Sequence, residues 1–160
     1  MTGRPAHPGP WARRLRDHAD ESGSAMVEFL GVTLILLVPL VYLVMALGRV
    51  QAGAFAAEGA AREAVRAMVT AESSAAGTAR ADIAAGIALA DQGFPRDAGA
   101  LTLECSDSPC LTPGGTVGAV VRVEVPLPLV PELLSPWLPL AVPVEAARAA
   151  TVDAYTSVRP

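Results

Sequence analysis

An apolar run without a single charged residue, from Phe29 to Gly48, limits what this chain can fold into more than any other feature. At about 1.5 Å of rise per residue, a helix of this length crosses a hydrocarbon core roughly 30 Å thick. Pro39 lies in the middle of the run, and membrane helices tolerate proline better than soluble helices do, usually with a kink. We therefore predict a transmembrane helix over 24–48.

The charges on the two sides of this run predict its orientation. Four of the twelve basic residues, all of them arginine, precede the run, whereas acidic residues outnumber arginines after it. Basic residues stay on the cytoplasmic side of a membrane helix. We expect 1–23 to be a cytoplasmic tail without regular structure and 49–160 to be a domain outside the membrane. The net charge of −4 does not favour nucleic acid as a partner, because nucleic-acid binding needs a basic face.

Helix-forming residues continue past the membrane segment through 49–72, so we predict that the same helix continues outside. Glu58 and Arg62 stand four residues apart and are expected to form a weak ion pair on a polar face. A second helix is predicted over 78–92, ended by Gly93 and Pro95. The residues expected on the apolar face of the first helix recur at steps of four and three: Val50, Ala54, Ala57, Ala61, Val65 and Met68.

The last third of the chain has the composition of strands. We predict strands at 101–105 and 117–125, joined through a turn at Gly114-Gly115, and a final strand at about 144–155. The stretch 126–143 holds six prolines, which exclude a second spanning helix. We expect an extended loop there, with a short turn of helix at 132–138. The predicted fold is α+β, a small antiparallel sheet packed on the long helix.

Cys105 and Cys110 are the two cysteines of the chain, and Ser, Asp and Pro between them favour a tight turn. In an exported domain such a pair is typical of a disulfide. Two free thiols or half of a metal site is the alternative. The two histidines, His7 and His18, both lie in the N-terminal tail, so the usual spacings of metal ligands are absent and we predict no metal and no cofactor.

Glu28 is the one acid within the apolar stretch, near its cytoplasmic edge. A carboxylate in lipid is energetically costly, so a function is the default hypothesis for such a residue. The alternative is that Glu28 simply lies at the membrane interface. It is the fifth residue after Gly23, and this spacing before a long apolar helix resembles a type IV prepilin processing site. Together with Val27-Glu28-Phe29, Pro39 and Gly48-Arg49, it resembles the N-terminal motif of TadE-like pilins of tight-adherence systems.

The resemblance, which covers about 20–50, implies a function. A prepilin peptidase facing the cytoplasm would cut between Gly23 and Ser24, and Glu28 would meet the new amino group of a neighbouring subunit. The partners would be the membrane, the peptidase, other pilin-like subunits and the assembly machinery. Ser24 replaces the Phe that major pilins commonly carry as their first mature residue. That replacement and the small, irregular domain favour a minor pilin or pseudopilin.

Two other classes compete with this interpretation. Ala52-Gly53-Ala54 has the small residues that signal peptidase prefers, so a secreted protein beginning at Phe55 is one alternative. An uncleaved single-pass membrane protein with a binding role is the other. We predict no enzyme activity, because Ser106 and Ser108 have no neighbouring base in the sequence.

Overall fold

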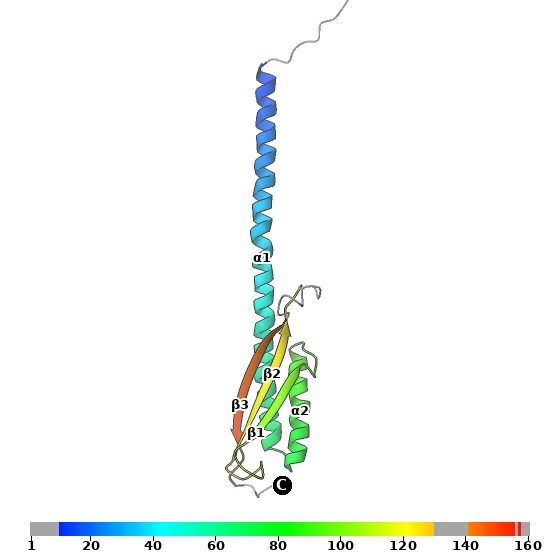
Figure 1. The fold of residues 1–160 in the computed structure, drawn as a ribbon, viewed down its shortest axis with the longest axis vertical. Coiled ribbons are helices and arrows are strands. Elements are labelled where there is room, and N and C mark those ends of the chain that lie inside the picture. Colours follow the sequence, from blue (N-terminus) through cyan, green and yellow to red (C-terminus); the bar gives the residue numbers. More distant parts are fainter. Residues whose placement is uncertain (1–9, 130–140, 156, 158–160) are drawn as a thin grey trace, which may run out of the picture. The chain divides into compact units, whose positions relative to one another are not determined.

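The computed structural model describes the backbone of residues 10–129, 141–155 and 157, and the side chains of these residues from Ser24 onward. The chain divides into two compact units, residues 1–44 and 45–160. The elements are α1 (Pro10–Val69), α2 (Ser74–Asp91), β1 (Gly99–Cys105), β2 (Thr116–Pro126) and β3 (Ala141–Thr151) (Figure 1). The predicted α+β class is confirmed.

Helix α1 is longer than predicted at its N-terminal end. The prediction that 1–23 lacks regular structure is wrong for 10–23, whose backbone is helical. Pro10 suits the first turn of a helix, because its missing N–H would have no intrahelical partner there. The Ala, Arg and Leu residues that follow are good helix formers, and extending an existing helix costs less than starting one.

The continuation of α1 beyond Gly48 is confirmed, since α1 passes through Pro39 and ends at Val69. At that end the Thr70 hydroxyl donates a hydrogen bond to the carbonyl of Arg66, at 2.9 Å. Helix α2 begins four residues earlier than predicted because Ser73 caps it: the Ala76 N–H donates to the Ser73 hydroxyl, at 3.3 Å.

The three strands form one antiparallel sheet in the order β1-β2-β3. The predicted strands at 101–105 and 117–125 are confirmed, and Gly114 has the positive φ, 78°, that a turn before β2 favours. Strand β3 occupies Ala141–Thr151 and contains Pro143, so the predicted loop over 126–143 is too long at both ends. Pro143 is compatible with an edge strand. The predicted helical turn at 132–138 lies outside the described residues.

The inward face of the sheet is covered by helices, as predicted. Val121 of β2 pairs with Leu101 of β1 and Ala146 of β3, and all three side chains belong to the core or pack against it. Helix α2 also contributes, through Ala81, Ala85 and Leu89. The core therefore consists mainly of alanine and valine, which bury little area each and allow the layers to approach closely. The buried residues of α1 in this core are Ala56, Ala57, Ala60, Ala61, Ala64 and Val65.

Two details of α1 depend on these neighbours. Of its predicted apolar face, Ala57, Ala61, Val65 and Met68 are buried, and Val50 and Ala54 are half-buried. The predicted pairing of Glu58 with Arg62 is wrong, because the Glu58 carboxylate lies 2.8 Å from the guanidinium of Arg148 in β3. Glu58 thus pairs with Arg148, on a strand that packs against α1, and not with Arg62 one helical turn away.

Candidate membrane anchor and assembly site

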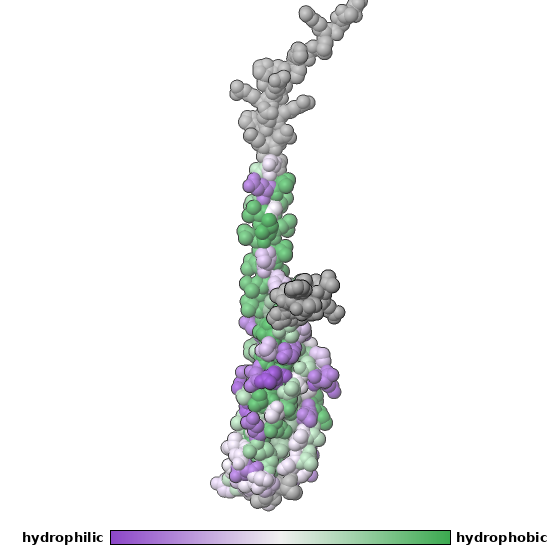
Figure 2. Space-filling view, in the orientation of Figure 1, coloured by the Kyte–Doolittle hydropathy of each residue, from purple (hydrophilic) through white to green (hydrophobic). Residues whose placement is uncertain are grey.

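The apolar stretch of α1 has the length and surface of a membrane anchor. Among the described residues, one helical segment, Ser24–Val69, is long and apolar enough to cross a membrane, and its most apolar window is entirely unburied. The apolar side chains of this stretch are exposed around the helix, for example Phe29 at 69% and Ile35 at 73%. Figure 2 shows hydrophobic residues over the same stretch on the face in view. The chain is therefore a candidate single-pass membrane protein.

Exposure on all sides distinguishes this segment from the second half of the same helix. Apolar area removed from water stabilises by roughly 25 cal/mol per Å², so a helix with apolar side chains on every face is unfavourable in water. Lipid removes this penalty without requiring a protein partner. From Ala56 to Met68, by contrast, α1 buries one face against the sheet and α2.

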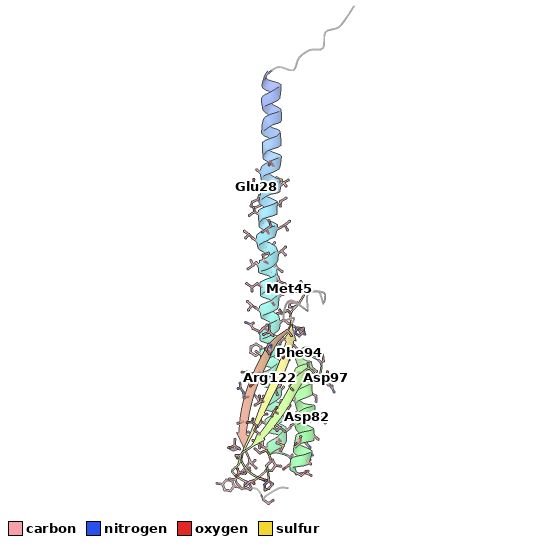
Figure 3. All side chains as sticks on the ribbon, in the orientation of Figure 1. Glu28, Met45, Asp82, Phe94, Asp97 and Arg122 are labelled. Carbon is pink, nitrogen blue, oxygen red and sulfur yellow. A yellow bond between two sulfur atoms is a disulfide. The ribbon has the colours of Figure 1, made fainter. Side chains whose placement is uncertain are left out.

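Glu28 lies at the N-terminal end of the predicted span, near the start of the described side chains. Its side chain is exposed and projects from α1 (Figure 3). No hydrogen bond or ion pair engages this carboxylate in the part of the chain that the structure describes. Its neighbours Val27 and Phe29 are apolar and exposed, at 71% and 69%. The structure thus places the Glu28 carboxylate on an apolar helix surface, with no partner among the described residues.

The predicted processing site lies one turn earlier in the helix. The backbone of Gly23 and Ser24 is helical, and the Ser24 side chain is exposed. Ser22, Gly23 and Ser24 are weak helix formers, and Gly costs about 1 kcal/mol relative to Ala in a helix interior. Opening the helix therefore costs less in this segment than in a run of alanine or leucine. A Cβ at Gly31, further along, would have nothing within 4 Å.

The predicted disulfide between Cys105 and Cys110 is present, with the two Cα atoms 5.3 Å apart. The loop that it closes is tied to β2 by Ser106. Its N–H donates to the Thr116 carbonyl at 2.9 Å, and its hydroxyl accepts from the Thr116 N–H at 2.8 Å. The same hydroxyl donates to the Asp107 carboxylate at 2.6 Å. The polar groups of this loop therefore hold its conformation.

Contacts between distant parts of the second unit are what sequence reasoning missed. The Arg49 guanidinium lies over the ring of buried Phe94, 4.4 Å from its centroid, just after the predicted span. A basic and an aromatic residue separated by more than forty positions carry no local signal of such contact. The same is true of Glu58 and Arg148.

No protein-family model matches this chain, and comparisons with curated proteins and with solved structures found no match. The fold and the site define its class: a candidate single-pass membrane protein carrying a disulfide-bonded α+β domain on the same helix as the apolar segment. Any closer assignment has to come from the residues themselves.

Proposed function

We propose that this chain is a minor pilin or pseudopilin of a TadE-like, tight-adherence type IV system. A prepilin peptidase removes residues 1–23, and the protein then assembles through its N-terminal helix. The single observation that carries the proposal is the carboxylate of Glu28, which has no partner among the described residues and is exposed on an apolar helix five residues after Gly23.

The cost of burying a charge in lipid favours a cationic partner for Glu28 from another chain. Burying an ionised carboxylate in lipid costs several kcal/mol, and a nearby ammonium offsets part of that cost. Cleavage after Gly23 would create such an ammonium on Ser24. The attraction is strong only where water is excluded, because it scales inversely with the local dielectric constant. Pairing between the acid of one subunit and the amine of its neighbour would therefore fix the register between their helices.

The local helix supports the proposed cleavage site. A peptidase needs an extended backbone, and the weak helix formers around Gly23 lower the cost of unwinding. Glycine also leaves the scissile carbonyl without a side chain beside it. The exposed apolar helix that follows is suited to lateral packing against other helices in the membrane.

The secreted alternative has less support. A cut before Phe55 would sever α1 where the helix is uninterrupted and where Gly53 is buried against Val125 and Phe94. Cleavage there would separate the apolar segment from the part of α1 that packs on the sheet. The uncleaved single-pass protein is compatible with the same fold, and it predicts an intact N-terminus.

The mass of the mature protein separates these classes. We expect the chain isolated from membranes that contain a prepilin peptidase to begin at Ser24, and to keep residues 1–23 when the peptidase is absent. Gly23→Val should block the cut, whereas Gly31→Val, in the same helix with open space around it, should not. A mature protein beginning at Phe55, or an uncut chain despite an active peptidase, would overturn the proposal.

A further inference from the structure

Strand β3 is an edge of the sheet that no other described element pairs. It hydrogen-bonds to β2 on one side, and the order β1-β2-β3 leaves its other edge open. An open edge offers a row of backbone N–H and C=O groups to another strand. Ala147, Arg148 and Ala149 are all exposed there.

A basic groove runs beside this open edge, between β3 and α1. Its volume is about 230 Å³, and it is lined by Arg62, Val65, Arg66, Val69 and Arg148, together with Ala149 and Ala150. Valine and alanine supply an apolar floor, and three guanidinium groups stand around it. Figure 1 shows β3 running alongside this part of α1.

The three arginines of the groove differ in their partners. Arg148 pairs with Glu58 at 2.8 Å. The guanidinium groups of Arg62 and Arg66 have neither a hydrogen bond nor an ion pair with any residue that the structure describes. Like charges four residues apart on a helix destabilise it slightly, so an anion that approaches this exposed pair is attracted to both guanidinium groups.

The spacing of the two free arginines matches that of alternate residues in a strand. Four residues of α-helix rise about 6 Å, and two residues of β-strand rise about 6.6 Å. An added strand along β3 would turn every second side chain toward α1. Carboxylates at positions i and i+2 of that strand would therefore face Arg62 and Arg66 in turn.

We infer that the open edge of β3 and the arginine groove together bind an extended acidic segment of a partner protein by strand addition. Backbone hydrogen bonds to β3 give the affinity, and two carboxylates on alternate residues give the specificity. The apolar floor at Val69 and Ala150 receives the small side chains between them.

Arg148 accounts for the choice of partner. An added apolar strand would cover Arg148 and its ion pair with Glu58, and taking such a pair out of water is costly. A strand that brings carboxylates to Arg62 and Arg66 offsets part of this cost. Arg148 therefore discourages apolar strands at this edge, and Arg62 and Arg66 favour an acidic segment.

Synthetic peptides test the proposal on the full chain in lipid nanodiscs. The probe is a seven-residue peptide with glutamates at positions three and five and threonine or valine elsewhere, its binding measured by fluorescence anisotropy. One control peptide has the same composition with adjacent glutamates, whose side chains would point to opposite faces of the added strand. A second control carries backbone N-methyl groups on the edge facing β3. A polyglutamate and a polyphosphate of equal charge report binding by charge alone.

We expect the alternating peptide to bind at least about tenfold more tightly than either control, a difference of about 1.4 kcal/mol. Arg62→Glu with Arg66→Glu should remove this preference, Lys at both positions should keep most of it, and Arg80→Glu on α2 should leave it unchanged. Equal binding of the adjacent-glutamate or N-methylated peptide, or of the polyanions, would overturn strand addition. So would the absence of binding by the unaltered chain at millimolar peptide.

Discussion

At the scale of single residues, Glu28 and Arg148 show that the energetic cost of a charged side chain depends on its surroundings. Glu28 is exposed on an apolar helix without a described partner, so placing it in lipid without a nearby cation is costly. Arg148 is also partly exposed, but Glu58 lies 2.8 Å away and water surrounds both groups. An exposed pair of this kind contributes about 0–1 kcal/mol to stability.

The contrast leads to a prediction for Glu28. With the chain processed in its native membrane, Glu28→Gln should leave insertion intact but weaken assembly between copies, because an unpaired ammonium in low dielectric costs about 3–5 kcal/mol. Co-purification of two differently tagged copies measures this. Glu28→Asp, which keeps the charge, should retain part of the assembly. Glu63→Gln, outside the predicted span, should have no effect. Unchanged co-purification of the Gln variant would contradict the role assigned to Glu28.

At the scale of elements, the two parts of α1 need different side chains. The first part needs apolar surface in every direction, whereas the part beyond Gly48 needs small residues on one face. Gly53 illustrates the second requirement, since a Cβ there would overlap the side chain of Val125 and touch the ring of Phe94 at 3.6 Å. At Gly59 the nearest atom would be the Cβ of Ala88 at 3.9 Å, which is ordinary contact.

These two glycines give a matched pair of variants. Both substitutions by alanine gain roughly 0.5–1 kcal/mol in helix propensity. At Gly53 overpacking opposes that gain by about 1–3 kcal/mol, so Gly53→Ala should lower the free energy of unfolding, and Gly59→Ala should leave it equal or higher. Thermal unfolding of the full chain in detergent, followed by circular dichroism, compares them. Equal midpoints would mean that the sheet does not approach α1 as closely as described.

At the scale of the whole molecule, the apolar segment is a candidate membrane anchor, and the arginines before it predict which side of the membrane the second unit occupies. The disulfide belongs to the second unit and is expected in an oxidising compartment. An outward-facing domain is consistent with a membrane-anchored, disulfide-bonded protein. The orientation itself is a prediction from the charges.

Charge reversal in the tail tests the orientation. Arg13, Arg14 and Arg16 changed to Glu should leave much of the domain on the cytoplasmic side, where Cys105 and Cys110 remain reduced. Alkylation of free thiols and protease digestion of spheroplasts both report this. The same reversal at Arg62, Arg66 and Arg80, outside the span, should keep the domain outside and oxidised. A domain that is outside and oxidised in both variants would contradict orientation by these arginines.

Prediction from sequence succeeded where the signal is local. The apolar run, the Val-rich alternation of β2 and the short spacing of Cys105 and Cys110 each lie within a few neighbouring residues, so composition and periodicity are enough to read them. The helix over 10–23 is not predicted, because its charged residues and lack of apolar periodicity favour disorder, although Ala, Arg and Leu also favour a helix that is already started.

The sequence by itself determined the membrane-sized helix, the α+β order of elements and the disulfide loop, because these follow from the chemistry of neighbouring residues. Only the tertiary structure decided that Glu58 pairs with Arg148, that Gly53 lies against Val125, and that Arg62 and Arg66 border an open strand. Each of these depends on how a helix packs on a strand more than sixty residues away. That packing is set by the summed burial of many small side chains and has no local pattern.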